Sequence, residues 1–337
     1  MSIRLKPLAE QVIVITGASS GHGLSAARKA AATGARVMLV ARDSDALQAV
    51  VQGIRAGGGD ADYVAADVSV EGDIDRVVIS TIHRFGGFDT WVNNAGVGTY
   101  AKALEQPTED HRRVFETNYW GMVHGSLAAV RHLKDRPGGG ALINVGSVNS
   151  DMSSPLLSSY NASKHAMKGF TDSLRIEVLM DALPVSVALL KPSPIGTPFT
   201  GHARNRTGKR ARLPRPIYAP EIVADAILDA ACHPRRSLTV GGSGKLQTIG
   251  AALFPTLFDH IAVRMAGALV ERAEPVGQVA GNLDAPQGDD GRVDGAQRGR
   301  RFSLFATARR HELATAAAVV GAGILARAAL TRWKRRA

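Results

Sequence analysis

A tyrosine and a lysine stand at a spacing that has a chemical use. Tyr160 and Lys164 are four residues apart, so on a helix they share one face a single turn apart. A lysine ammonium beside a phenol favours the phenolate and lowers the pKa of the phenol from about 10 toward neutral pH. Such a tyrosine can exchange a proton with a carbonyl or carbinol oxygen. The pair therefore predicts proton chemistry, although a surface pair on an ordinary helix would share this spacing.

A serine precedes this pair at the expected end of a strand. Ser147 follows the apolar run 141–145, which is typical of a buried strand. Ligands bind at the carboxyl ends of the strands in doubly wound sheets. We therefore expect Ser147 to lie at the ligand-binding edge of such a sheet.

A glycine-rich turn near the start of the chain follows a second apolar run. Residues 11–16 are typical of a strand, residues 17–23 of a turn, 24–33 of a helix and 36–41 of another strand. Glycines let the backbone approach a pyrophosphate, whose charge meets the amides of the helix N-terminus. The spacing G-x-x-x-G-x-G fits the general dinucleotide template loosely, so a turn without a ligand stays open.

The end of the second strand bears on the choice of cofactor. A carboxylate at this point binds the ribose 2′-hydroxyl of NAD, whereas a cation binds the 2′-phosphate of NADP. Ala41 occupies the expected carboxylate position and Arg42 follows it, which favours NADP. Asp43 leaves NAD open, because a shift of register would bring its carboxylate to the ribose.

Strands and helices alternate along the next two hundred residues. Further strands are predicted at 60–66, 88–92, 141–146, 185–190 and 237–240, and helices at 44–56, 72–85, 108–134, 158–180 and 220–231. This alternation predicts an α/β fold, a Rossmann-type doubly wound parallel sheet of about seven strands with helices on both faces.

Six motifs occur in an order that is specific when they are taken together. They are T-G-A-S-S-G-H-G at 16–23, Asp67-Val68, N-N-A-G at 93–96, Asn118, Ser147 and Y-N-A-S-K at 160–164. With these motifs the chain resembles the short-chain dehydrogenases/reductases over about residues 8–245.

The resemblance implies roles for particular residues. Tyr160 would be the catalytic acid/base, Lys164 would lower its pKa and hold the nicotinamide ribose, Ser147 would bind the substrate oxygen, and Asn118 would support a water-mediated proton relay. The implied cofactor-binding residues are Gly17, Ser19, Ser20, Gly21, His22, Gly23, Arg42, Asp67, Val68, Asn94, Ala95, Gly96, Tyr160, Lys164, Pro192 and Thr197. Asp67 and Val68 would flank the adenine, and Thr197 would bind the nicotinamide carboxamide.

Two positions depart from the family pattern. His22 replaces the usual apolar residue, and Pro192-Ser193 replaces the usual Pro-Gly after the sixth strand. The pyrophosphate turn and the floor of the substrate pocket are therefore expected to differ from those of relatives. Neither change affects the proton chemistry.

The resemblance implies an oxidoreductase that interconverts a carbonyl and an alcohol. Arg42 favours NADP(H) as its cofactor, and the apolar stretch 246–270 favours a lipophilic small molecule as its substrate. NAD is the second choice of cofactor. The alternatives are a non-redox enzyme on the same fold, an isomerase or dehydratase, and a nucleotide-binding regulatory protein. A regulatory protein would be expected to lose Ser147, Tyr160 or Lys164, and all three are present.

Charge and cysteine content limit the other functions. The net charge of +11 does not come from residues 1–200, which carry 19 basic and 19 acidic side chains; residues 201–220 carry 6 basic and no acidic ones. Nucleic-acid binding by the catalytic body thus loses its support.

The single cysteine, Cys232, excludes an internal disulfide framework and a cysteine metal cluster, so no metal is expected. Residues 1–10 contain no apolar signal region, and we expect a cytoplasmic protein.

The last third of the chain divides by composition. We expect one catalytic domain over residues 1–270, with the cofactor motifs in 11–197 and a basic substrate loop and C-terminal helices in 198–270. The apolar stretch 246–270, which Pro255 kinks or divides, suits core, a contact in a homo-oligomer, or a wall for a lipophilic substrate. Residues 271–312 are typical of a flexible linker. The tail 313–337 is apolar and basic, which suits either contact with a membrane or an amphipathic helix that packs on protein or stays in solvent.

Overall fold

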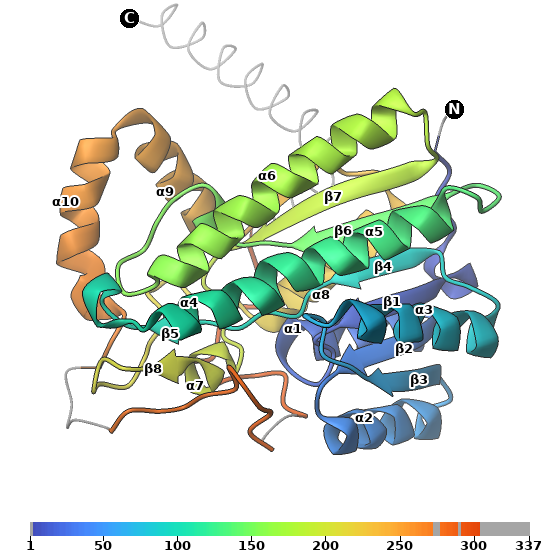
Figure 1. Cartoon of the computed structure of the whole chain (residues 1–337), viewed down its shortest axis with the longest axis horizontal. Coiled ribbons are helices and arrows are strands. Elements are labelled where there is room, and N and C mark those ends of the chain that lie inside the picture. Colours follow the sequence, from blue (N-terminus) through green and yellow to red (C-terminus); the bar gives the residue numbers. More distant parts are fainter. Residues whose placement is uncertain (1–2, 272–276, 289–290, 304–337) are drawn as a thin grey trace, which may run out of the picture.

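Parallel strands form the centre of the molecule, which the computed structural model describes over residues 3–271, 277–288 and 291–303 (Figure 1). The main sheet has seven strands in the order β3-β2-β1-β4-β6-β7-β9, all of them parallel to their neighbours. The strands are β1 (Val12–Thr16), β2 (Arg36–Ala41), β3 (Asp60–Ala65), β4 (Thr90–Asn93), β6 (Gly140–Val145), β7 (Val185–Pro192) and β9 (Ser237–Val240). The chain has the Rossmann-type doubly wound fold, and the fold class predicted from sequence is confirmed.

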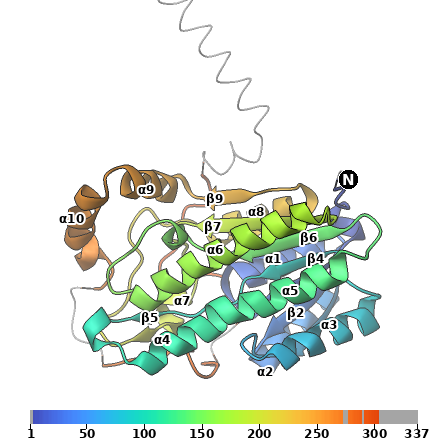
Figure 2. The ribbon, with the colours of Figure 1, turned by 45° about the horizontal axis from the view of Figure 1, so that its top comes forward.

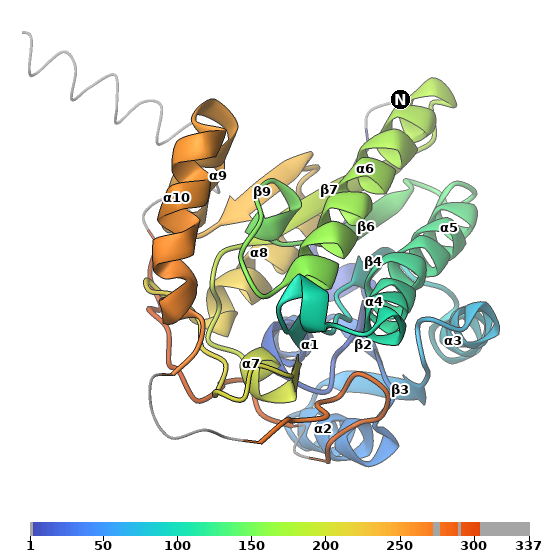
Figure 3. The ribbon, with the colours of Figure 1, turned by 60° about the vertical axis from the view of Figure 1, so that its left-hand side comes forward.

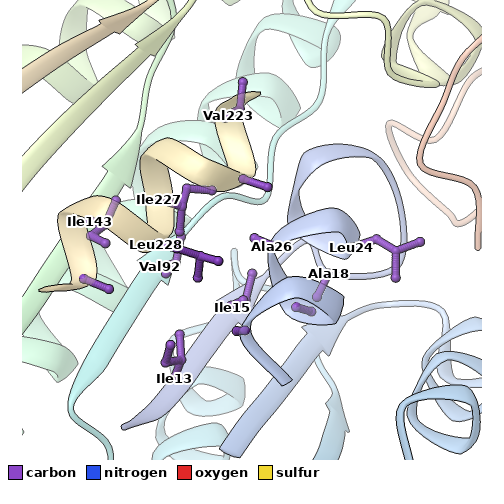
Figure 4. Close-up of a cluster of buried hydrophobic side chains, with 14 of the residues drawn as sticks. Ile13, Ile15, Ala18, Leu24, Ala26, Val92, Ile143, Val223, Ile227 and Leu228 are labelled. Carbon is purple, nitrogen blue, oxygen red and sulfur yellow. The ribbon is translucent and has the colours of Figure 1, made fainter. Parts of the chain in front are cut away.

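Helices cover both faces of this sheet. One face packs α1 (Gly21–Ala32), α2 (Ser44–Ala56) and α8 (Pro220–Cys232); the other packs α3 (Glu71–Phe85), α5 (Gly121–Leu133) and α6 (Ser158–Met180). The alternation within β1 explains the two layers, since Ile13 and Ile15 belong to the first core and Val12 and Val14 to the second. Figure 4 shows the first core, where α1 and α8 pack on the central strands.

The predicted helix over 108–134 is interrupted at its centre. It consists of α4 (Thr108–Phe115), a π-helical turn η3 (Glu116–Trp120) and α5. A π turn inserts one extra residue and changes the direction of a side chain, often at a functional site. Asn118 lies in this turn and is fully buried. The prediction of one regular helix was therefore wrong at the residue with a predicted role.

Two short helices stand beside the carboxyl ends of the strands. Pro255 divides the apolar stretch, as expected, into α9 (Gly242–Leu253) and α10 (Pro255–Met265) (Figure 2). Nearby, α7 (Phe199–His202) precedes β8 (Arg204–Asn205), which pairs with β5 (Thr99–Tyr100) in a small second sheet. The remaining regular turns are η1 (Leu8–Glu10), η2 (Ala103–Glu105), η4 (Val148–Ser150) and η5 (Ala266–Ala268).

Beyond residue 271, the described parts 277–288 and 291–303 contain no helix or named strand. These parts nevertheless bond to the body, for example through the paired backbones of Asn205 and Val279. The tail 313–337 lies outside the described residues. Among the described helices, none combines the length and the apolar character needed to cross a membrane.

Candidate active site

Two cavities meet at the carboxyl ends of the strands. The first, of about 150 Å³, is lined by the turn after β1, the end of β2 and residues 66–68 and 94–97. The second, of about 340 Å³, lies between η4, α6 and the pair α9–α10. His22, Thr197 and Phe199 line both cavities. A ligand in the first cavity can therefore reach a ligand in the second at this junction.

Most of the predicted cofactor residues line the first cavity. They are Gly17, Ser19, Ser20, Gly21, His22, Arg42, Asp67, Val68, Asn94, Ala95, Gly96 and Thr197. Gly23 lies beneath the turn, where a Cβ atom would come within 2.4 Å of Gly17 O. Pro192, Tyr160 and Ser147 line the second cavity, which meets the first at His22, Thr197 and Phe199.

The glycine turn brings its backbone against the next strand. Gly17 has a φ of +64°, and a Cβ atom there would lie 2.7 Å from Ala95 Cα. The side-chain amide of Asn94 donates to Thr16 O at 2.8 Å and to Gly17 O at 3.1 Å. Asn94 therefore locks the turn after β1 to the end of β4.

Three buried polar atoms belong to residues that line the first cavity and form no hydrogen bond of ordinary geometry among the described residues. They are His22 Nδ1, Asn94 Oδ1 and Thr117 Oγ1. Burial lowers the pKa of His22 to about 4, although the neighbouring Asn94 side chain opposes this effect. His22 is thus neutral at physiological pH. Buried polar atoms without partners are costly, so their presence indicates that this cavity suits a polar ligand.

Two residues at the end of β2 have different environments. The Asp43 carboxylate accepts a hydrogen bond from Ala46 N at 3.0 Å and caps α2. Arg42 lines the first cavity, where its guanidinium donates to backbone carbonyls of residues 282–284. Arg42 therefore contributes a positive charge to the lining of the cavity, whereas the Asp43 carboxylate caps the N-terminus of α2.

Asp67 lies across the cavity and is paired with arginine. It accepts a hydrogen bond from Arg113 Nη2 at 2.6 Å and one from Ser69 Oγ at 2.7 Å. Burial alone would raise the pKa of Asp67, but these bonds outweigh it and hold the pKa below its usual value. Arg113 was not expected from the sequence, because it lies 46 positions away on α4.

Ser147 and Tyr160 are brought together at the second cavity. Ser147 is the N-cap of η4, where its hydroxyl accepts a hydrogen bond from Asn149 N at 3.1 Å, and it is near enough to Tyr160 to affect the pKa of the phenol. The Tyr160 ring lies 5.4 Å from that of Phe199, centroid to centroid. The predicted neighbourhood of Ser147 and Tyr160 is thus present.

Lys164 lies on the same face of α6 but does not bond to the phenol. Its Nζ donates to Val145 O at 3.2 Å and lies 5.5 Å from the centre of the Tyr160 ring. Burial raises the pKa of Tyr160 to about 12, with the neighbouring Ser147 side chain opposing it. Burial also lowers the pKa of Lys164 to about 8. The Tyr160 pKa is thus raised in the protein alone and not lowered as expected, because desolvation of the phenolate is the largest effect on it.

Asn118 connects the cofactor side of the site to the helix of Tyr160. Its side chain accepts from Val97 N at 2.8 Å and donates to Val97 O and to Ser163 Oγ, both at 3.0 Å. Ser163 lies next to Lys164 in α6. The amide of Asn118 thus fixes the position of α6, which the sequence alone does not reveal.

Known proteins share this architecture. The family described as short chain dehydrogenase matches residues 11–208. An uncharacterized oxidoreductase of Bacillus subtilis, YxnA, is 42% identical over 98% of this chain and 93% of its own length. Dehydrogenase/reductase SDR family member 7B of Danio rerio is 34% identical over 78% of this chain and 88% of its own.

Solved structures of the same family align with the chain. A short-chain dehydrogenase/reductase of Mycobacterium marinum superposes with a TM-score of 0.63 and 26% identity, covering 71% of this chain and 96% of its own. An alcohol dehydrogenase of Thermococcus sibiricus, solved with 5-hydroxy-NADP, superposes with a TM-score of 0.59 and 27% identity. The match covers 68% of this chain and 94% of that one. The chain belongs to the short-chain dehydrogenases/reductases.

Proposed function

We propose that the protein is an NADP(H)-dependent oxidoreductase that interconverts a carbonyl and an alcohol on a lipophilic substrate. The observation that carries this proposal is that Ser147 and Tyr160 line one largely apolar cavity, which meets a polar, glycine-lined one. A proton donor at the junction of two such cavities is suited to hydride transfer between two ligands.

The lining of the first cavity has the chemical groups that a nicotinamide dinucleotide requires. Gly17, Gly21 and Gly23 leave no room for side chains, so the backbone can approach a pyrophosphate. His22 Nδ1, Asn94 Oδ1 and Thr117 Oγ1 offer polar atoms that the described chain does not satisfy. Bound here, the cofactor would supply or accept the hydride.

Arg42 and Asp43 favour the phosphorylated cofactor. Asp43 could select NAD only if its carboxylate left the N-terminus of α2, where it accepts from Ala46 N. Arg42 already lines the cavity and carries the charge that a 2′-phosphate requires. The Thermococcus alcohol dehydrogenase was solved with an NADP derivative, which agrees with this choice.

Tyr160 acts as the proton donor in the reducing direction. With a pKa of about 12, its phenol is protonated at neutral pH and can give its proton to the substrate oxygen. Ser147 lines the same cavity, where its hydroxyl would bind the substrate oxygen. The Lys164 ammonium then stabilises the phenolate that remains. Asn118 holds α6 in place through its hydrogen bond to Ser163. We also propose that Asn118 supports a water-mediated proton relay to solvent.

The second cavity indicates the substrate class. Leu246, Phe258, Ile261, Met265 and Leu269 form an apolar wall opposite Tyr160. Its volume of about 340 Å³ lies at the lower end of the range of about 300–1,000 Å³ for small-molecule sites. A compact apolar ketone or secondary alcohol suits such a space.

The direct test is NADPH oxidation with a panel of ketones and aldehydes of increasing apolar size. We expect turnover with NADPH, little with NADH, and a kcat/KM that rises with apolar size until the cavity is filled. A non-redox enzyme of this fold would convert substrate without consuming NADPH. A regulatory protein would bind NADPH and turn over none of the panel.

We also propose a homo-oligomer in the cytoplasm that contacts membranes through its tail. Apolar side chains exposed on α9 and α10, such as Leu253 and Leu257, support a subunit contact. The support for membrane contact is the composition of residues 313–337.

A further inference from the structure

Residues 277–288 and 291–303, which we call the strap, run along the mouth of the first cavity. Figure 3 shows this orange-red segment beside α7 and near the side of the sheet where α1 and β2 lie. The strap lies beyond residues 11–208, the part that matches the family. The Bacillus relative aligns over 98% of the chain, so its alignment extends into the strap.

The first anchor of the strap is at the end of β2. Leu283 is completely buried and packs against Val97 and Val114. Its carbonyl accepts from Arg113 Nε at 3.1 Å and from Arg42 Nη1 at 3.3 Å. Arg42 also donates to the carbonyls of Asn282 and Asp284. The strap thus binds the guanidinium that we assign to the 2′-phosphate.

The second anchor is at the glycine turn. Gly291 N donates to Ser19 O at 2.8 Å, and Gly21 N donates to Arg292 O at 2.9 Å. Gly21 is the first residue of α1, so its amide belongs to the helix end that attracts phosphate. A strap carbonyl therefore accepts a hydrogen bond at the point where a pyrophosphate is expected.

The third anchor is on the substrate side. Gly295 N donates to Gly196 O at 2.8 Å, and a Cβ atom on Gly295 would lie 2.1 Å from Thr197 O. Further along, the Gln297 side chain accepts from Leu213 N at 2.7 Å. The strap is thereby attached to both sides of the cavity mouth.

The space beneath the strap is small for the proposed cofactor. The cavity measures about 150 Å³, with Asn282 and Pro286 of the strap in its lining. Sites for small ligands measure about 300–1,000 Å³, and a dinucleotide is larger than most such ligands. In this position the strap narrows the cavity, so a displaced strap would leave more room for a dinucleotide to enter or leave.

We infer that the strap gates cofactor exchange, and that NADP(H) enters or leaves only after the strap releases Arg42 and the glycine turn. This inference rests on the proposed dinucleotide function. A charge-assisted bond from a guanidinium to a phosphate is roughly twice as strong as one to a neutral carbonyl. Arg42 can therefore exchange its strap carbonyls for the 2′-phosphate, which makes entry of NADPH favourable.

The experiment measures NADPH association and dissociation by stopped-flow fluorescence on the full-length chain. Leu283→Ala removes the buried anchor. Gly291→Ala strains the strap without a clash, since Gly291 has a φ of +94° and open space around its Cβ position. Leu133→Ala is the control for the first variant, because Leu133 is equally buried in the second core. Gly58→Ala is the control for the second, with a φ of +82° and open space.

We expect both rate constants to rise together in the strap variants. Left-handed strain of about 1–2 kcal/mol in Gly291→Ala corresponds to roughly five- to thirtyfold faster exchange. The rise in Leu283→Ala should be at least about tenfold, and the two controls should match the wild type.

Four results would overturn the gate. The first is an association rate unchanged in both strap variants, even with faster dissociation. The second is an equal rise in the controls, which would reflect general destabilisation. The third is a wild type that binds neither NADPH nor NADH, which would overturn the proposed function as well. A wild type that binds NADPH while the strap variants exchange it at the wild-type rate would overturn the gate alone.

Discussion

The environment of Tyr160 determines whether its side chain acts as a proton donor or as a proton acceptor. Spacing places Lys164 one turn away on α6, but spacing does not show how deeply the pair is buried. Desolvation raises the pKa of Tyr160 to about 12 and lowers that of Lys164 to about 8. Both shifts favour the neutral form. The phenol is therefore set up as an acid, which suits reduction of a carbonyl.

Replacement of Tyr160 by phenylalanine tests this role directly. Tyr160→Phe keeps the ring beside Phe199 and removes the proton. We expect turnover to fall by at least roughly 10²–10⁴-fold, the usual contribution of acid–base catalysis. NADPH affinity, measured by fluorescence titration, should stay the same. Tyr63→Phe, on β3, is the control; near-normal turnover in Tyr160→Phe would contradict the mechanism.

The pKa of Lys164 predicts a pH dependence for reduction. Its folded pKa of about 8 lies below its ordinary value of 10.5, so Lys164 loses its proton as pH rises through about 8. The phenolate that forms on Tyr160 then loses its neighbouring charge. We expect log(kcat/KM) for reduction to be flat below pH 8 and to fall with a slope near −1 above it. A profile that is flat to pH 10 would show that the charge of Lys164 does not contribute.

Arg42 should set the preference between the two cofactors. Loss of a charged hydrogen bond costs about 1.5–3 kcal/mol, which is roughly ten- to 150-fold in affinity. Arg42→Ala should weaken NADPH binding by that factor and leave NADH binding almost unchanged. Arg76→Ala, an exposed arginine on α3, controls for the loss of charge. A wild type that prefers NADH would contradict the assignment.

At the scale of an element, the N-terminus of α2 explains why the neighbouring carboxylate does not select NAD. Asp43 caps this helix, so Asp43→Ala should lower the free energy of unfolding by about 0.5–2 kcal/mol. NADH and NADPH affinities should both stay at wild-type values. Urea unfolding and fluorescence titration measure the two effects. A selective loss of NADH affinity would instead place Asp43 at the ribose.

Helices and strands could be predicted from the sequence where the local pattern and the tertiary packing favour the same structure. The β-branched runs at 12–16 and 36–41 form strands as predicted, because both of their faces are buried. The π turn at Asn118 did not follow, since it depends on bonds to Val97 and Ser163 in distant elements. Local periodicity carries no information about such bonds.

The position of the strap could not be predicted from local sequence patterns either, because its contacts are distant in the sequence. Residues 271–312 are rich in glycine and charge and lack periodicity, which is typical of a linker. Their described parts bond through backbone groups to Ser19, Gly21 and Gly196, and backbone groups leave no pattern in the sequence. Motifs therefore predicted most of the cavity lining, whereas the strap and Arg113 became visible only in three dimensions.

At the scale of the whole molecule, the six cations of residues 201–220 are partly neutralised within the fold. Arg204 and Arg206 both bond to Asp110, at 2.6 and 2.7 Å, and Asp110 is 2% exposed. Burial would raise the pKa of Asp110, but the bonds from Arg206 and Arg204 lower it. This part of the basic loop therefore attaches α7–β8 to α4, and it is less available to anionic partners than the charge count suggests.

Attraction to membranes should thus come mainly from the end of the chain. Arg332, Lys334, Arg335 and Arg336 follow an apolar segment, and each basic residue near an anionic surface contributes about 1 kcal/mol. The matched variants are the full-length chain and a chain ending at Ser303, which retains the strap. We expect only the full-length protein in the membrane fraction, and equal kcat for both, because the motifs lie before Thr200. Release by high salt would indicate a surface helix, and release only by detergent an inserted one. Recovery of both chains in the supernatant would contradict membrane contact through the tail.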